Sequence, residues 1–344
     1  MGFRLRFVLL LWWLPLLGHP EAPSGAPRQA PAPQAQAGVR ELLRLEENLD
    51  AMGSVYSVTL YGYEQERMEA AVEAAFNEIG RLDRMMSNYR PESELSEVNR
   101  HAAQKPVRVT PEFFDLLAKC RQYSRESDGA FDITVGPLMK VWGFYRGTGK
   151  LPAKDEVARS LEKVGYRHVI LDNENHTVRF DEPGVELDPG GIGKGYAVDR
   201  VVDILKENGI ASALVSAGGS SIYALGVPAG NAQGWEVKIR DPNHPRETIQ
   251  DLRLKNESMS TSGNYEKFFV AEGKLYSHIM DPRTGFPAEG VLSVSVIAPT
   301  TLDSEAWTKP YYILGRRWAV QHRPTEFRVF LCEDKAEQPC AWLQ

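Results

Sequence analysis

The sequence is poor in cysteine, with three residues in 344, and it has no Cys/His cluster, no C-x-x-C pair and no block of basic residues. The low, odd cysteine count argues against a disulfide framework, and the missing clusters argue against a zinc site. The net charge is -6 with both signs interspersed, so nothing in the charge favours nucleic acid as the main partner. With 42% hydrophobic residues the chain can bury a full core, and a small molecule is the more natural ligand.

Long hydrophobic runs are also missing. The most apolar stretch, Phe7–Leu17, is too short to span a bilayer comfortably, but it suits the apolar region of a secretory signal. Residues 1–18 are therefore predicted to be a signal peptide or an uncleaved N-terminal anchor. Residues 19–38, rich in Pro, Ala and Gln, are predicted to be a linker, which leaves 39–344 as the folded domain.

The three cysteines are unevenly placed along the chain. Cys332 and Cys340 are near enough in sequence to pair in an oxidising compartment and to tie down the C-terminal tail. Cys120 falls within a predicted helix and is expected to be a buried thiol.

From residue 39 onward, helical and strand-like segments follow one another without a second linker, which indicates a mixed α/β body. Apolar residues recur at three- and four-residue steps over Met68–Met86, and Thr110 before Pro111 marks the start of a second helix. A third helix is predicted over Gly195–Glu207. The predicted strands are "MGSVYSVTLYGY", "HVILD", "TVRFD", "VELD", "ALVSAGG", "WEVKIRDP" and "LSVSVIAPT".

A glycine-rich stretch, "LDPGGIGKGYAVD", lies between a predicted strand and this third helix. A Walker loop would need Gly at the position of Asp188 and Ser or Thr at the position of Gly195. A dinucleotide fingerprint would need its third small residue where Tyr196 or Val198 stands. The stretch is therefore neither of these two nucleotide loops.

The same stretch still has the chemistry of an anion site. Small residues free the backbone N–H groups, the following helix presents its positive end, and Lys194 adds an ammonium. The alternative is that the glycines only permit a sharp turn and that Lys194 is solvated.

Segments spread over residues 52–315 resemble, in chain order, those of the ApbE-type FAD:protein FMN transferases, formerly described as thiamine-biosynthesis lipoproteins. The matching segments are "MGSVYSVTL", "MSNYRPESELSEVNR", "DGAFDITVGPLMKVWGF", "LDPGGIGKGYAVDRVVDIL", "SAGGSSIYALG", "TSGNYEKFF", "YSHIMDPRTGFPA" and "VSVIAPTTLDSEAWTKPYYILG". The resemblance implies an α+β fold in which mixed sheets pack with helices.

The resemblance also implies an activity, which is the magnesium-dependent transfer of FMN from FAD to a threonine hydroxyl of an exported or membrane redox protein, with release of AMP. It places the protein in the periplasm or on the outer face of the cytoplasmic membrane. The chain has no Ser/Asp-Gly-Ala-Thr-like acceptor motif, so it resembles the transferase and not the acceptor.

Matched by position, the resemblance assigns FAD contacts to residues whose chemistry suits them, because aromatic and thioether groups pack on rings and carboxylates accept hydrogen bonds from amines or ribose. These residues are Met52, Tyr89, Ala130, Phe131, Asp132, Asp188, Lys194, His278 and Ile279. Ordinary core packing is the alternative for Met52 and Phe131.

The predicted catalytic residues are His278, Lys194 and Lys309. His278 suits phosphate binding or proton relay near neutral pH, with Asp303 as the other candidate base. The alternative for His278 is a structural role in which it bonds the "DPRTG" turn.

The chain departs from the metal pattern of the family it resembles, in which a glycine-loop carbonyl, placed here at Gly191, joins an Asp and a Thr. Here Glu305 stands where the Asp is usual and Lys309 where the Thr is usual. Glu305 can still offer oxygen to magnesium, with Thr308 or Asp303 as a further ligand, whereas a protonated Lys309 cannot ligate.

The "NxGGD" motif of the family is altered too, with Ser216 for Asn and Ser220 for Asp. One hypothesis is that Lys309 supplies cationic charge at the diphosphate where other members rely more on magnesium. Two other activities fit the same residues, namely an FAD-binding or carrier protein with little turnover and an FAD pyrophosphatase.

Overall fold

The structure, a computed structural model, describes residues 41–147, 149–334 and 339–344. The predicted signal or anchor segment and the linker, residues 1–38, lie outside the described residues. Residues Glu41–Gln344 form one unit. No helix in the described part of the chain combines the length and apolar character that a membrane span requires.

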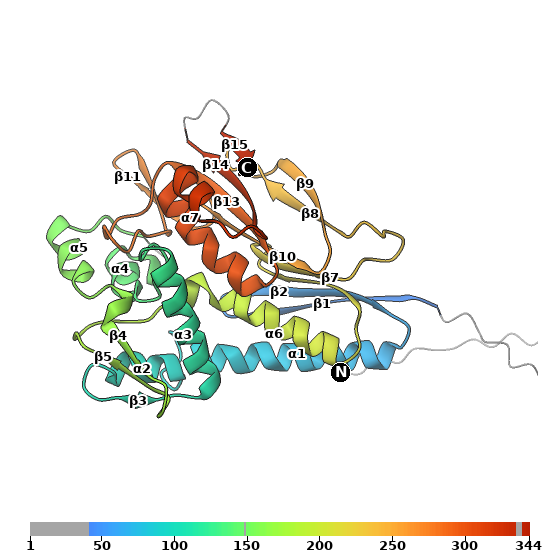
Figure 1. The fold of residues 1–344 in the computed structure, drawn as a ribbon, viewed down its shortest axis with the longest axis horizontal. Coiled ribbons are helices and arrows are strands. Elements are labelled where there is room, and N and C mark those ends of the chain that lie inside the picture. The colour runs from blue at the N-terminus through green and yellow to red at the C-terminus, as the bar shows by residue number, and fades with distance from the viewer. Residues whose placement is uncertain (1–40, 148, 335–338) are drawn as a thin grey trace, which may run out of the picture. The chain divides into compact units, whose positions relative to one another are not determined.

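An eight-stranded sheet runs through this unit (Figure 1). Its strands, in spatial order, are β1 (Leu43–Ala51), β2 (Ser54–Gly62), β6 (Ser212–Ala217), β7 (Ser221–Leu225), β10 (Glu257–Gly263), β13 (Val291–Ala298), β14 (Arg328–Glu333) and β15 (Cys340–Trp342). Each neighbouring pair is antiparallel. The predicted α+β class, with sheets packed against helices, is confirmed.

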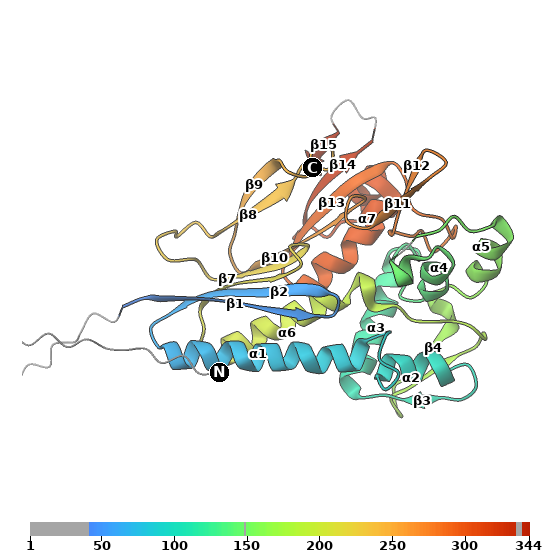
Figure 2. The same ribbon diagram turned by 180° about the vertical axis from the view of Figure 1, so that it is seen from behind.

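Three helices cover one face of this sheet: α1 (Gln65–Met86), α6 (Gly193–Glu207) and α7 (Thr301–His322). Figure 2 shows α1 and α6 side by side beneath β1 and β2. The predicted apolar stripe of α1 is buried, as the period of 3.6 requires. α7 contains Pro310 and is kinked at Gly315, where φ is +74°.

The other face of the sheet is covered by a hairpin of β8 (Trp235–Arg240) and β9 (Thr248–Leu254), whose apolar residues pack on β7, β10, β13 and β14. A second hairpin, β11 (Phe268–Ala271) and β12 (Lys274–Ser277), follows β10 in the chain. Its strand β12 leads directly into the segment that carries His278.

The remaining elements gather at one end of the unit (Figure 1). They are α2 (Glu94–His101), α3 (Pro111–Glu126), α4 (Gly136–Val141), α5 (Lys154–Leu161), a small sheet of β3 (Val107–Arg108), β5 (Thr177–Phe180) and β4 (Val169–Asp172), and the 3₁₀ turns Phe144–Arg146, Tyr166–His168 and Pro189–Gly191. Thr110 caps α3 as predicted, because its hydroxyl accepts a bond from the Phe113 amide at 3.4 Å.

Two strand predictions need correction. "VELD" is not a strand, because it makes only a single bridge, from Glu186 to Val135. The strand in "MGSVYSVTLYGY" begins at Ser54, because Met52 and Gly53 form a two-residue turn with φ of +51° and +68°. Positive φ at both positions is the geometry of a tight hairpin turn between β1 and β2.

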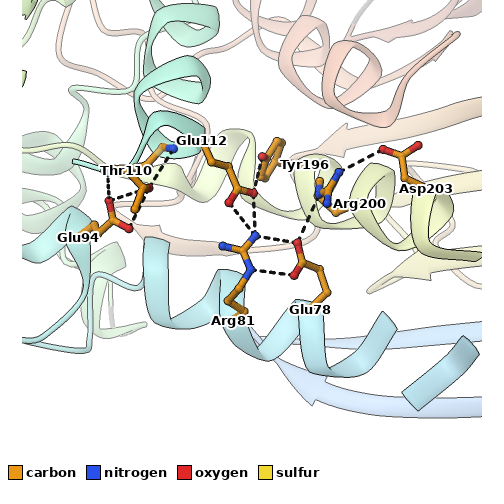
Figure 3. A network of polar contacts seen from close by, with 9 residues as sticks. Glu78, Arg81, Glu94, Thr110, Glu112, Tyr196, Arg200 and Asp203 are labelled. Atoms are coloured by element: carbon orange, nitrogen blue, oxygen red, sulfur yellow. Dashed lines mark hydrogen bonds and ion pairs between the residues drawn. The ribbon is translucent and has the colours of Figure 1, made fainter. Parts of the chain in front are cut away.

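A polar network joins α1, α3 and α6 (Figure 3). The Arg81 guanidinium bonds Glu78 at 2.7 Å and Glu112 at 2.8 Å, and Tyr196 donates to Glu112 at 2.7 Å. Arg200 of α6 lies 3.4 Å from the same Glu78. The network therefore ties the start of α6 to the two helices beside it.

Cys332 and Cys340, which lie near enough in sequence to pair, form a disulfide bond. The two residues are register partners of β14 and β15, so the bond ties the last strand to the sheet. Cys120 is a buried free thiol, as predicted.

Reducing this disulfide is expected to lower the free energy of unfolding by about 2 to 3 kcal/mol, since the bond closes only a short loop in the unfolded chain. Thermal unfolding with and without dithiothreitol measures the effect. A Cys332→Ser/Cys340→Ser variant should already unfold at the lower temperature and should not respond to the reductant. An equal response in this variant would assign the effect to another part of the chain.

Candidate active site

A cavity of about 520 Å³ opens where the β1–β2 turn, the glycine loop, the segment before β13 and the first half of α7 meet. The nine residues assigned to FAD all line it, and so do Gly191, Glu305 and Lys309. A second, polar hollow of about 230 Å³ shares Asn88, Tyr145 and Asp188 with this cavity. Residues spread along most of the described chain therefore meet at one ligand-sized space.

The glycine loop turns sharply into α6, which begins at Gly193 and so includes Lys194 in its first turn. Asp188 starts this turn, because its Oδ1 accepts a hydrogen bond from the Gly190 amide at 2.8 Å. Its other carboxylate oxygen makes no hydrogen bond to a described residue, and it is available to a ligand. Burial raises the pKa of Asp188.

Two carboxylates join the start of α6 to the start of α7. Asp199 accepts bonds from the Thr301 and Leu302 amides at 2.7 and 2.8 Å, and burial raises its pKa to about 6. The Gly195 amide donates to Glu305 Oε2. A β-carbon on Gly195 would lie 2.5 Å from the Thr301 carbonyl oxygen, so only glycine permits this approach.

An aromatic wall forms one side of the cavity. Tyr89 is 72% exposed and stacks on Tyr145, with 4.9 Å between ring centroids, and its hydroxyl donates to the Tyr145 carbonyl at 3.0 Å. Tyr145 and Phe144, which also lines the cavity, were not predicted as site residues. Their signal in the sequence was the aromatic run "WGFY" at the end of a matched segment.

Met52 and Phe131 pack in the interior and also line the cavity. Core packing and a place in the ligand site are therefore compatible for both residues. Phe131 is 4% exposed and meets Tyr123 edge to face at 5.6 Å. Met52 accepts a bond from the Tyr56 hydroxyl at 3.3 Å.

Asp132 lines the cavity, and its carboxylate also holds a local turn. Its Oδ1 accepts bonds from the Thr134 amide at 2.8 Å and the Thr134 hydroxyl at 2.7 Å, and its Oδ2 accepts one from the Tyr166 amide. Because both oxygens already hold the local turn, Asp132 shapes the cavity wall, and Asp188 is the carboxylate with a free oxygen.

His278 has a defined tautomer. Its Nδ1 lies 3.1 Å from the Lys267 carbonyl oxygen, which only accepts, so Nδ1 carries the hydrogen and Nε2 is left bare. Burial lowers the pKa of His278 to about 4. The imidazole is therefore neutral at physiological pH and able to accept a proton at Nε2.

The structural alternative for His278 is wrong, because the "DPRTG" turn is held without it. Asp281 accepts bonds from the Arg283 guanidinium at 2.9 and 2.8 Å, and its carbonyl accepts the Gly285 amide at 2.9 Å.

The second candidate base, Asp303, does not line the cavity. It accepts bonds from the Tyr123 hydroxyl and from the hydroxyl of Thr300, which is the residue that caps α7. Of the two candidate bases, His278 is the one that lines the cavity.

Three lysines line the cavity, namely Lys194, Lys267 and Lys309. Lys194 donates to the Ser220 hydroxyl at 2.6 Å, and Lys309 donates to the Glu305 carbonyl at 2.9 Å. Within the described residues, neither ammonium has a carboxylate within 4.0 Å. Burial lowers the pKa of Lys309 to about 8, which keeps it mostly protonated at pH 7.

Thr308, predicted as a metal ligand, does not line the cavity. Its side chain is fully buried, and its hydroxyl donates to the Glu305 carbonyl at 2.7 Å and accepts a bond from Ser262 at 2.8 Å. The helical position next to Lys309 therefore points the hydroxyl back into α7 and β10.

The site combines a glycine turn at a helix start, an aromatic wall and lysine side chains, and it is built on an antiparallel sheet covered by three helices. These features are those of a protein that binds a ligand with both a flat ring and phosphate groups. The sequence profile of the ApbE family matches residues 52–328, and the chain belongs to this family.

Particular relatives agree with this assignment. The chain is similar to the FAD:protein FMN transferase of Klebsiella pneumoniae (strain 342), with 33% identity over 266 residues, 77% of this chain and 80% of that protein. It is 31% identical to the FAD:protein FMN transferase of Escherichia coli (strain K12) over 295 residues, 83% of this chain and 82% of that one. The crystal structure of the ApbE protein of Thermotoga maritima has a TM-score of 0.78 at 30% identity, covering 87% of this chain and 96% of that one.

Proposed function

We propose that this protein is an FAD:protein FMN transferase, which moves FMN from FAD to a threonine hydroxyl of an acceptor redox protein and releases AMP. The observation that carries the proposal is that a bare imidazole nitrogen of His278 and two unpaired ammonium groups, Lys194 and Lys309, share one aromatic-walled cavity. Family membership and the names of the relatives support the same activity.

FAD fits the cavity by the chemistry of its walls. Tyr89, Tyr145, Phe131 and Met52 offer faces and a thioether to flat rings, and the free oxygen of Asp188 accepts from amine or ribose groups. The Gly193 and Lys194 amides in the first turn of α6 have no hydrogen-bond partner among the described residues and favour the diphosphate, whereas the Gly195 amide already donates to Glu305.

In the transfer step, the threonine oxygen attacks the phosphorus on the FMN side of the FAD diphosphate, and His278 Nε2 accepts the hydroxyl proton. The bond from that phosphorus to the bridging oxygen breaks, and AMP leaves with this oxygen. Lys194, Lys309 and the α6 amides stabilise the charge that builds up on the phosphate oxygens.

Magnesium, which the family resemblance implies, does not fit these residues. No group of three or more His, Cys, Asp or Glu in the described ranges could hold a metal ion. Gly191 and Glu305 line the cavity, but the Thr308 hydroxyl is turned away from it. The position of the usual Thr is taken by Lys309, whose ammonium donates to the Glu305 carbonyl. No step of the transfer is therefore routed through a metal.

We also propose that the protein works outside the cytoplasm, in the periplasm or on the outer face of the cytoplasmic membrane, where its acceptor would also lie. The Cys332–Cys340 disulfide supports this location, because such bonds persist in oxidising compartments.

The proposal is tested by incubating the purified protein with FAD and an acceptor protein that carries the threonine motif, followed by intact-mass analysis and AMP chromatography. We expect the acceptor to gain one covalent FMN for each AMP released, and a Thr→Ala acceptor to gain none. AMP and free FMN without acceptor labelling would instead make the protein an FAD pyrophosphatase. Bound FAD with neither product would make it a carrier.

A further inference from the structure

Lys309 is an unusual residue for the interior of an α-helix that faces a buried cavity. Its stem lies against the glycine loop, since a β-carbon on Gly191 would come within 3.3 Å of Lys309 Cε. Among the described residues no carboxylate lies within 4.0 Å of its ammonium, and the Glu305 carboxylate favours its charge only from a greater distance. Burying an ammonium without a direct ion-pair partner is costly. A ligand of opposite charge in the cavity would remove this cost.

The hydrogen bonds of Lys309 leave room for such a ligand. An ammonium has three donors, and the Glu305 carbonyl takes one of them at 2.9 Å. The Lys194 ammonium likewise uses one donor, to the Ser220 hydroxyl at 2.6 Å, and keeps two for a ligand. Lys194 is close enough to Lys309 to disfavour its charge, and Lys267, Lys309 and Lys194 all disfavour protonation of His278.

A diphosphate diester carries two negative charges, and Lys194 and Lys309 each have two free donors to offer it. The nearest buried carboxylate of α7, Glu305, is 3% exposed and turns Oε2 to the Gly195 amide. Ser220, which the Lys194 ammonium contacts, is neutral. Lys194, Lys309 and the neighbouring Lys267 therefore offer a dianion cationic donors, in a cavity that the Glu305 and Glu266 carboxylates also line.

We propose that Lys309 takes the place of a divalent cation at the FAD diphosphate, so that this transferase binds and cleaves FAD without a required metal. The inference rests on the proposed function. In the transfer step, the two free donors of Lys309 bond phosphate oxygens while the bond to the bridging oxygen breaks, and Lys309 itself gains and loses no proton.

The first test compares transfer by the full-length protein in excess EDTA with transfer in magnesium. We expect the wild-type rates to agree within about twofold, because the cationic charge is built into the chain. A Glu305→Asp/Lys309→Thr variant, which installs the usual residues of the family, should be at least about tenfold faster in magnesium than in EDTA. Loss of wild-type transfer in EDTA with recovery in magnesium would overturn the inference.

The second test measures FAD binding by fluorescence quenching in EDTA and does not require turnover. Lys309→Met keeps the length of the stem and should weaken binding by about 10- to 100-fold, the range expected for loss of hydrogen bonds to a charged group. Lys255→Thr, at an exposed position away from the cavity, should bind like wild type. Thermal unfolding of each variant reports whether it is folded.

The two tests separate the inference from the proposed function. If no acceptor is labelled under any condition, the transferase proposal fails, while FAD binding in EDTA and its loss in Lys309→Met still support the role of Lys309. If wild type binds FAD only with magnesium, or folded Lys309→Met binds FAD as tightly as wild type in EDTA, the inference is wrong whatever the activity.

Discussion

Transfer of FMN to a threonine acceptor is expected to fall by about 10²- to 10⁴-fold when His278 is replaced by alanine, the range for loss of a general base. The loss should appear in kcat and leave FAD affinity nearly unchanged, because Nε2 acts on the acceptor hydroxyl and not on FAD. Single-turnover labelling of the acceptor, together with FAD titration, measures both quantities.

The matched control is His244→Ala, an exposed histidine that bonds Asp241 and does not line the cavity. It should transfer FMN at the wild-type rate. A His278→Ala variant that keeps more than about a tenth of the wild-type rate would assign the base to another group.

The same histidine predicts the acid limb of the pH profile. Burial lowers the pKa of His278 to about 4, so nearly all of the imidazole is already in its neutral, proton-accepting form well below pH 6. We expect kcat/KM to rise as pH increases through about 4 and to show no inflection at the ordinary histidine value of about 6.5. This limb should be absent in His278→Ala, and an inflection near 6.5 in wild type would contradict the buried tautomer.

Gly195→Ala is expected to lower the free energy of unfolding by about 1 to 3 kcal/mol and to abolish most transfer, because it overpacks the contact between α6 and α7. The added β-carbon would lie 2.5 Å from the Thr301 carbonyl oxygen and 2.9 Å from Glu305 Oε2. These are backbone and buried atoms with little freedom to move. The helices must separate, which displaces Lys194 and Lys309 together. Thermal and urea unfolding measure the stability.

Gly80→Ala provides the matched control, since it makes the same replacement within a helix. A β-carbon on Gly80 meets only the Arg84 guanidinium, at 3.7 Å. This variant should be as stable as wild type or more stable by about 0.5 to 1 kcal/mol, as expected for alanine over glycine in a helix. Equal losses in the two variants would mean that the close approach at Gly195 is not the cause.

Local patterns in the sequence predicted much of the frame. The stripe of α1, the Thr110 cap of α3 and the glycine turn into α6 depend on neighbours three or four residues away, which a sequence displays directly. β1 was not predicted, because its middle is polar and exposed and it forms a strand through pairing with β2.

The sequence predicted residues that the structure brings to one cavity, but it did not predict their hydrogen-bond partners. Every residue assigned to FAD lines the cavity, yet the hydrogen bonds that occupy Asp132 come from Thr134 and Tyr166, and the bond that orients His278 comes from Lys267. The bond from Thr134 is a local turn contact two residues along the chain, whereas Tyr166 is 34 positions from Asp132 and Lys267 is 11 from His278, so tertiary structure sets these two partners. The same reason applies to Tyr145, whose place on the wall depends on its stacking with Tyr89.

The network around Arg81 has a consequence for how FAD is received. Tyr196 lies two residues beyond Lys194 and is bonded to Glu112, which Arg81 holds from α1, so the first turn of α6 cannot slide or rotate without breaking several polar contacts at once (Figure 3). The amide dipoles of that turn are consequently oriented before FAD arrives. Little reorganisation free energy is then needed when charge moves onto the phosphate oxygens, and the helix acts as a preorganised electrostatic element.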